Sequence, residues 1–125
     1  MKKTERSPEA MLPLTPAVFH ILLALADGER HGYGIMLEIA ARTNGAMHIG
    51  PGTLYGSIKR MLADGLIEAS EERPDPKMDD ERRRYYRLTN LGQRVLQTEA
   101  KRLEQIVHIA RSKHILTGSE MIGGA

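Results

Sequence analysis

The sequence contains no cysteine and no tryptophan, and aromatic residues make up only 4% of its 125 residues. The lack of cysteine excludes disulfide bonds, thiolate nucleophiles and cysteine-based zinc sites. No apolar run approaches the roughly 20 residues that a membrane-spanning helix needs, and no signal-like apolar stretch follows the polar first residues. We therefore expect a cytoplasmic protein without a membrane partner.

The usual sequence signatures of enzymes are also missing. The chain contains no Gly-x-x-x-x-Gly-Lys phosphate loop, no His-Glu-x-x-His pair and no Gly-x-Ser-x-Gly elbow. Its five histidines are His20, His31, His48, His108 and His114. No two of them stand four residues apart, as metal-binding pairs on a helix do. The sequence therefore predicts no enzyme, no metal site and no cofactor.

A chain of 125 residues has the usual size of one domain, and its charged fraction of 27% is ordinary for a soluble protein. The net charge is only +2, but the charges are sorted along the chain. Residues 64–81 contain eight acidic and two basic residues, whereas residues 82–113 contain nine basic and two acidic ones. Such sorting fits either surfaces that neutralise each other in the fold or a basic surface for an anionic partner.

Apolar spacing predicts three helices behind a flexible N-terminus of residues 1–13. The first helix is expected over residues 15–26, where Thr15 is suited to cap it and a proline follows. The second opens at residue 31 and is closed by the Asn-Gly pair at 44–45. The third follows the Gly-Pro-Gly turn at 50–52 and is closed by an Asp-Gly pair.

Two strands and a long helix complete the pattern. Residues 66–73 and 83–88 read as strands on either side of a polar loop with two prolines, which predicts a hairpin with a long loop. Thr89 is suited to cap a last helix over residues 90–117, and the tail of residues 118–125 is expected to be disordered.

The last helix contains an apolar seam whose members recur at steps of four and three residues. The seam consists of Leu96, Ala100, Leu103, Val107, Ala110 and His114, and Ile106 and Ile109 widen it. Such a stripe would face water on an isolated chain. We therefore predict a homodimer in which the C-terminal helices pack on each other and on the first helix. The expected interface is Leu96, Ala100, Leu103, Ile106, Val107, Ala110 and His114.

Three short helices followed by a two-stranded hairpin form the winged helix-turn-helix arrangement, whose third helix enters the major groove of DNA. Four short motifs occur within this pattern of elements. They are His-Gly-Tyr at 31–33, Gly-Thr-Leu-Tyr at 52–55, Asp-Gly-Leu-Ile at 64–67, and Arg-Tyr-Tyr-Arg-Leu-Thr at 84–89 with Gly92. Over about residues 14–94, the chain closely resembles the PadR family of winged helix regulators.

This resemblance implies a mainly α protein with a small β-hairpin. Residues 14–89 would form a winged helix DNA-binding domain, and residues 90–117 a single C-terminal dimerisation helix of the family's shorter branch. The family's function implies a dimeric repressor of a nearby operon. The expected partner is double-stranded DNA, in a pseudo-palindrome with half-sites about one helical turn apart.

The third helix has the residues that a DNA groove requires. With Ile58 at the centre of the buried side, the opposite side is small, polar and basic. We expect Arg60 to reach a guanine, Ser57 a base or phosphate, and Lys59 the DNA backbone. The alternative is that these basic residues are ordinary solvated charges. The predicted DNA-binding set is Tyr33, Thr53, Tyr55, Ser57, Lys59, Arg60, Arg82, Arg83, Arg84 and Tyr85.

The hairpin forms the wing of this fold. Its loop contains four acidic residues within 75–81, which DNA phosphates would repel. The wing is therefore expected to contact DNA through the arginines at its base. A different class of function is a winged helix that contacts only proteins, which would not need these basic surfaces. Relatives of this type can bind flat aromatic compounds with aromatic side chains, but the C-terminal helix here has none. Any effector is therefore expected to be small and hydrophobic, in a site lined by Leu, Ile, Val and Met.

Overall fold

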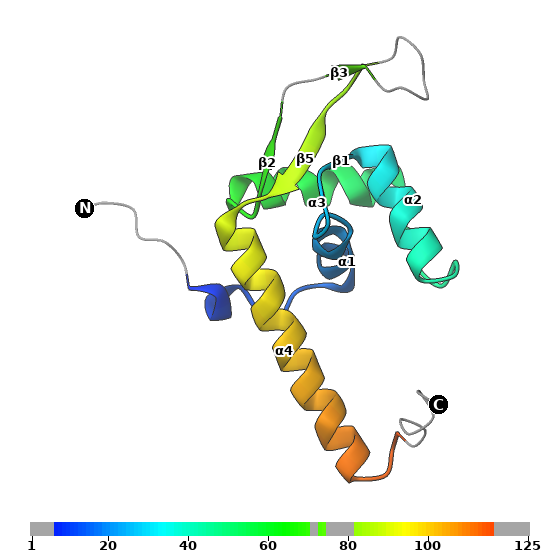
Figure 1. Cartoon of the computed structure of the whole chain (residues 1–125), viewed down its shortest axis with the longest axis vertical. Coiled ribbons are helices and arrows are strands. Elements are labelled where there is room, and N and C mark those ends of the chain that lie inside the picture. The colour runs from blue at the N-terminus through cyan, green and yellow to red at the C-terminus, as the bar shows by residue number, and fades with distance from the viewer. Residues whose placement is uncertain (1–6, 71–72, 75–81, 117–125) are drawn as a thin grey trace, which may run out of the picture.

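A computed structural model of the chain describes residues 7–70, 73–74 and 82–116. Its elements in chain order are the 3-10 helix η1 (Pro8–Met11), helix α1 (Pro16–Ala24), strand β1 (Arg30–His31), helices α2 (Gly32–Arg42) and α3 (Pro51–Ala63), strands β2 (Ile67–Ala69), β3 (Arg73–Pro74), β4 (Arg82–Arg83) and β5 (Tyr85–Leu88), and helix α4 (Asn90–Ser112). Among the described residues, the 3-10 helix and three α-helices precede the hairpin and a long α-helix follows it (Figure 1). The predicted winged helix-turn-helix with a long C-terminal helix is therefore confirmed.

Threonine side chains begin two of the helices, as the sequence predicts. The Oγ1 of Thr15 accepts a hydrogen bond from the Val18 N–H at 3.2 Å, and the Oγ1 of Thr89 accepts one from the Gly92 N–H at 2.9 Å. Each bond satisfies one of the backbone donors that a helix start leaves unpaired. Helix α1 ends at Ala24, slightly earlier than expected.

The segment before α1 has a defined structure. Ser7 caps η1, because its Oγ accepts a backbone N–H of the same turn at 3.3 Å. Met11 and Leu12 are half-buried against the hydrophobic core, and η1 packs on α4. The prediction of a flexible N-terminus over residues 1–13 is therefore wrong for residues 7–13, because these apolar side chains find a surface on which to pack.

Strand β5 is the centre of a three-stranded antiparallel sheet of order β1-β5-β2. Strand β1, which the sequence analysis does not predict, joins the edge of β5 where His31 pairs with Tyr85. Strands β3 and β4 pair farther out along the hairpin, toward the tip of the wing (Figure 1). The strands expected over residues 66–73 and 83–88 are thus each divided into two short pieces.

The first turn of α4 is attached to the loop that directly follows α3. The Thr89 N–H donates to the Leu66 carbonyl at 3.1 Å, and the Thr89 hydroxyl donates to the Gly65 carbonyl at 2.6 Å. Gly92 allows this close approach, because a Cβ at that position would collide with the Leu66 carbonyl oxygen and would lie 3.0 Å from its carbon. The contact between α4 and this loop therefore combines the Thr89 N–H and hydroxyl with the close backbone approach at Gly92.

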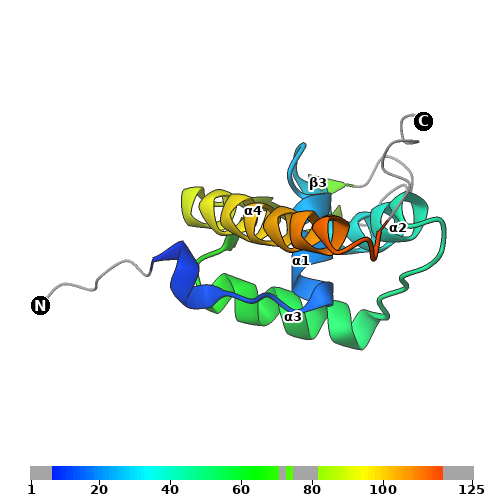
Figure 2. The ribbon, with the colours of Figure 1, turned by 90° about the horizontal axis from the view of Figure 1, so that it is seen from below.

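The hydrophobic core lies where the three short helices, the sheet and the first turns of α4 meet. Its fully buried apolar side chains are Ile21, Leu22, Ile35, Leu54, Met61, Ile67 and Val95. Helix α1 lies between α3 and α4, so the outer side of α3 points away from α4 (Figure 2). Within the described residues, no helix has the length and apolar character that crossing a membrane would require.

Helix α4 ends at Ser112 instead of continuing to residue 117. His114 adopts a left-handed backbone conformation with φ of +62°, and the Ile115 N–H bonds back to the Ala110 carbonyl at 2.9 Å. This geometry is a common way for a helix to terminate. The prediction that His114 belongs to the helical seam is therefore wrong. The predicted disordered tail of residues 118–125 lies outside the described residues.

Candidate nucleic-acid interface

One side of α3 is buried and the opposite side is open. Leu54, Ile58 and Met61 are at most 2% exposed. The outward side carries Thr53, Gly56, Ser57, Arg60 and, at the helix end, Asp64, with Lys59 on its flank; Ser57 and Asp64 are half-buried and the others are exposed. Apart from the two chain neighbours of Gly56 and the helix's own backbone, no described residue has an atom within 4 Å of where a Gly56 side chain would begin. The predicted orientation of this helix is therefore observed, and its outward side leaves room for a large partner.

The start of α3 has backbone donors that no side chain caps. Its cap residue is Gly50, which provides no side-chain acceptor, whereas the cap residues of α1, α2 and α4 all do. The nearby N–H groups of Gly52 and Thr53 lie at the positive end of the helix dipole. Lys59 and Arg60 form no ion pair with any residue that the structure describes. This combination of donors and unneutralised charge suits phosphate oxygens.

The four tyrosines differ in how far they are exposed. Tyr33, on α2, is 44% exposed and Tyr55, on α3, is 46% exposed. The phenol end of Tyr55 lies against Gly32, where an added Cβ would collide with its hydroxyl, and this contact brings α3 close to the start of α2. Tyr85 is half-buried. Tyr86 is only 7% exposed and is a core residue, and its burial raises the pKa of the phenol.

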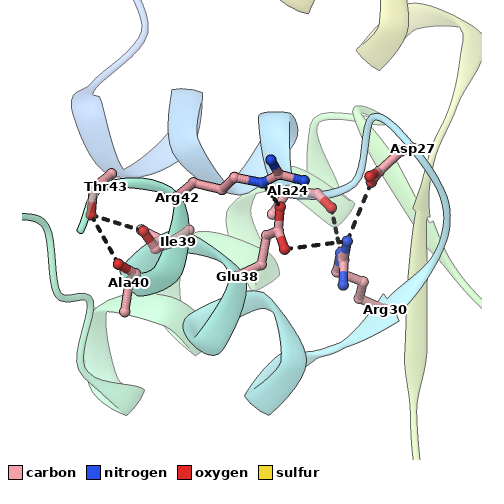
Figure 3. A network of polar contacts seen from close by, with 8 residues as sticks. All are labelled: Ala24, Asp27, Arg30, Glu38, Ile39, Ala40, Arg42 and Thr43. Atoms are coloured by element: carbon pink, nitrogen blue, oxygen red, sulfur yellow. Dashed lines mark hydrogen bonds and ion pairs between the residues drawn. The ribbon is translucent and has the colours of Figure 1, made fainter. Parts of the chain in front are cut away.

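Arg30 connects β1 to α1 and α2. Its Nε donates to the Ala24 carbonyl at 2.7 Å, and its guanidinium lies 3.4 Å from the carboxylates of both Asp27 and Glu38 (Figure 3). Glu38 also pairs with Arg42 at 2.6 Å, and the hydrogen bond from Arg42 to this carboxylate raises the pKa of the Arg42 guanidinium. The network holds the short strand β1 against two helices.

Of the arginines at the base of the wing, the structure describes the side chains of Arg84 and Arg87. Arg84 is exposed, whereas Arg87 is paired across the strands with Glu68 at 2.9 Å. Residues 82–83 form β4, but their side chains lie outside the described part of the chain. The same holds for the acidic loop of residues 75–81. The predicted contacts from Arg82 and Arg83 therefore stay predictions.

Glu99 is a buried charged residue that is absent from the site residues predicted from the sequence. It is 1% exposed, and its carboxylate accepts hydrogen bonds from the Arg102 Nε at 2.5 Å and the Leu14 N–H at 3.0 Å. The bond from Arg102 is the main cause of a lowered pKa, which burial opposes and the Leu14 N–H reinforces. A signal was present, because Glu99 follows Leu96 at the spacing of the helix's core residues.

The seam on α4 divides into two parts. Leu96 is 6% exposed and packs in the core of its own chain, so the prediction that it lies in a dimer interface is wrong. The second half of the helix projects beyond the short helices (Figure 1). There Ile106, Val107 and Ile109 are 47%, 38% and 45% exposed. We call the surface formed by Ala100, Leu103, Ile106, Val107, Ile109 and Ala110 the α4 stripe.

A groove of about 430 Å³ lies between α1 and α2. Its apolar lining includes Leu23, Ala24 and Ile39, and its polar lining includes His20 and Glu38. Leu23 is 42% exposed there. The groove lies beside the Arg30 network and apart from the outward side of α3.

Comparison with known proteins gives consistent similarities. Residues 21–98 match the Transcriptional regulator PadR-like family. A transcriptional regulator of Mycobacterium tuberculosis is 33% identical over 105 residues, which cover 84% of this chain and 87% of that protein. A solved structure of a transcriptional regulator from Clostridium thermocellum is similar with 26% identity and a TM-score of 0.64, over 76% of this chain and 89% of that one.

Bacillus subtilis PadR, solved in complex with operator DNA, has a similar fold. The TM-score is 0.59 at 21% identity, and the likeness covers 69% of this chain and 47% of that chain. A PadR family transcription regulator from Clostridium difficile gives a TM-score of 0.65 at 24% identity, over 78% of this chain and 97% of that one.

Proposed function

Because the chain belongs to the PadR-like family of transcriptional regulators, we propose that it binds a specific double-stranded operator and represses a nearby operon in the cytoplasm. The observation that carries the proposal is the outward side of α3. There, uncapped backbone donors at the helix start are followed by Lys59 and Arg60, which have no ion-pair partner among the described residues. Members of this family regulate transcription, so the chain is not an enzyme.

The proposed contacts follow from position and chemistry. Arg60 reads guanine in the major groove, where its two donors match the O6 and N7 acceptors, and Ser57 contacts a neighbouring base or phosphate. Lys59 and the uncapped donors near Thr53 hold phosphates. The hydroxyls of Tyr33, Tyr55 and Tyr85 also contact phosphates. The wing contributes Arg84, with Arg82 and Arg83 as further predicted contacts.

We propose that the protein acts as a homodimer held together by the α4 stripe. Exposed isoleucine and valine side chains at three positions of one projecting helix are costly in water, and a second copy would cover them. A symmetric dimer presents two α3 helices, so the operator is expected to be a pseudo-palindrome with half-sites about one helical turn apart.

The groove between α1 and α2 is the proposed seat of a small hydrophobic effector. Its volume of about 430 Å³ is inside the range of roughly 300–1,000 Å³ that is usual for ligand pockets. The test is a titration with the apolar fluorophore 1-anilinonaphthalene-8-sulfonate. Its binding is expected to be lost in a Leu23→Glu variant, and binding that is unchanged by this substitution would place the effector elsewhere.

The decisive experiment is selection of bound duplexes from a random DNA pool, followed by fluorescence anisotropy titrations of the selected duplex at several salt concentrations. We expect a pseudo-palindromic sequence and an affinity that falls steeply with salt. An Arg60→Ala variant should bind more weakly, whereas Glu104→Ala, a change on the exposed side of α4, should bind as the wild type does. If the protein binds no duplex at low ionic strength, the proposal is contradicted. That outcome favours the alternative function, a winged helix protein that contacts only other proteins.

A further inference from the structure

His31 takes part in two structures at once. Its backbone belongs to β1 and pairs with Tyr85 of β5. Its side chain caps α2, because its Nδ1 accepts a hydrogen bond from the Gly34 N–H at 2.9 Å. A ring nitrogen that accepts a hydrogen bond has no proton of its own, so this cap uses the unprotonated Nδ1. One residue therefore links the first turn of a helix to the central strand of the wing.

The imidazole ring provides a second contact with the wing. Its centroid lies 5.3 Å from that of the Tyr85 ring, and the two planes meet at 74°, an edge-to-face arrangement that is favourable for aromatic rings. An asparagine in place of His31 would keep a capping acceptor but lose this ring contact. A phenylalanine would keep a ring but lose the acceptor. The side chain at this position thus needs both properties.

The neighbours of His31 are arranged around the same point. Gly32 leaves space for the Tyr55 hydroxyl, which a Cβ would contact too closely. At Gly34 a Cβ would lie 3.3 Å from the imidazole Cε1, tighter than most such contacts. Tyr33, between the two glycines, is 44% exposed. The four residues His31 to Gly34 thus bring together the three tyrosines that the proposed function assigns to phosphate, each from a different element.

We propose that His31 is a positioning residue for DNA binding, which holds Tyr33, Tyr55 and Tyr85 in one phosphate-facing surface by coupling the start of α2 to the wing. The proposal rests on the proposed function. The side chain itself does not contact DNA. Its loss is expected to lower the affinity for every duplex and to reduce the number of phosphates held, without changing which bases are read.

The test compares His31→Asn, His31→Phe and His31→Ala with the wild type on the duplex that the wild type selects from a random pool. Thr15→Ala is the matched control, because it removes the cap of α1 without touching the wing. We expect His31→Ala to weaken binding about tenfold and to reduce the salt slope by about 1 or more, the change for one lost phosphate contact. The variants His31→Asn and His31→Phe, which each keep one of the two contacts, should have affinities between those of His31→Ala and the wild type.

Hydrogen exchange of the free protein provides a readout that needs no DNA. In His31→Ala and His31→Phe the Gly34 amide should lose protection, and in His31→Ala and His31→Asn the amides along β5 should exchange faster. Thr15→Ala should change neither region. The inference is overturned if the His31 variants keep the wild-type salt slope and the wild-type protection of β5. It is also overturned if they lose no more DNA affinity than Thr15→Ala does. If the wild type itself selects no duplex, the proposed function fails, and the exchange of β5 still decides whether His31 couples the two elements.

Discussion

Glu99, on the core-facing side of α4, accepts a hydrogen bond at 3.0 Å from the backbone N–H of Leu14, which lies 85 residues earlier in the chain. The same carboxylate is bound by Arg102. Burial of a charge is costly unless the charge is paired and hydrogen-bonded. Here Arg102 provides the opposite charge, and Arg102 and the Leu14 N–H provide the hydrogen bonds. This single side chain joins the segment before α1 to the helix that carries the α4 stripe.

The first prediction concerns the stability that Glu99 provides. Glu99→Ala should lower the free energy of unfolding by about 2 kcal/mol at neutral pH, because hydrogen bonds to a charged group are lost. The pKa of Glu99 is lowered in the folded chain. Its contribution is therefore complete above the pKa of the unfolded chain, about 4.3, and is lost as the pH falls through the lower folded value.

Urea unfolding of wild type and variant from pH 7 to pH 3 measures this effect. The two stabilities should converge toward the acid end of the series. Glu104→Ala, which removes an exposed carboxylate from the same helix, serves as the control and should change little. A difference between wild type and Glu99→Ala that stays constant with pH would show that the loss comes from packing and not from the charge.

The second prediction compares two glycines in helices. Gly92→Ala should destabilise the chain by about 1–3 kcal/mol, the usual cost of overpacking, because its Cβ would meet the Leu66 carbonyl. Gly56→Ala should instead stabilise the chain by up to about 1 kcal/mol, since alanine favours a helix and the site is open. Thermal unfolding of both variants checks the prediction, and equal effects of the two substitutions would contradict it.

The third prediction tests the α4 stripe. Ile106→Asp should convert the dimer to a monomer at micromolar concentration, because a charge would be placed in a desolvated apolar contact. His108→Asp places the same charge on the exposed side of the helix away from the α4 stripe and should leave the dimer intact. Light scattering during size-exclusion chromatography gives the molar mass. A wild type that is already monomeric would reject the proposed assembly.

The fourth prediction separates base reading from phosphate binding. Arg60→Ala should reduce the discrimination between the selected duplex and a duplex with an altered half-site by about 1–3 kcal/mol. Lys59→Ala and Arg83→Ala should weaken binding to both duplexes equally and reduce the salt slope by about 1 each. Anisotropy titrations of both duplexes measure these quantities. The reverse pattern would mean that the two roles are misassigned.

Local signals are sufficient to predict most of the helices and the open side of α3. Thr15 and Thr89 stand directly before apolar runs of helical spacing, and both cap helices in the structure. The position of Leu54 and Ile58 on one side of a helix likewise places Arg60 on the other. These features depend on neighbours within one or two turns, which the sequence displays directly.

Contacts between distant residues account for what the sequence did not predict. Strand β1 is only the pair Arg30–His31, too short for any periodic pattern, and it forms because β5 offers an edge. The role of Glu99 depends on Leu14 at the other end of the chain. The end of α4 at Ser112 is instead a local feature that no glycine or proline marks, because His114 itself takes the left-handed conformation.

The attachment of Thr89 and Gly92 to the loop after α3 has a consequence for operator geometry. The Thr89 N–H and hydroxyl, together with the close backbone approach at Gly92, attach α4, the proposed dimerisation helix, to the end of α3, the proposed DNA-reading helix. In the proposed dimer, the distance between the two α3 helices would therefore be fixed. One base pair inserted between the half-sites turns one of them by about 34–36° relative to the other, and a joint attached at these points would resist following that rotation.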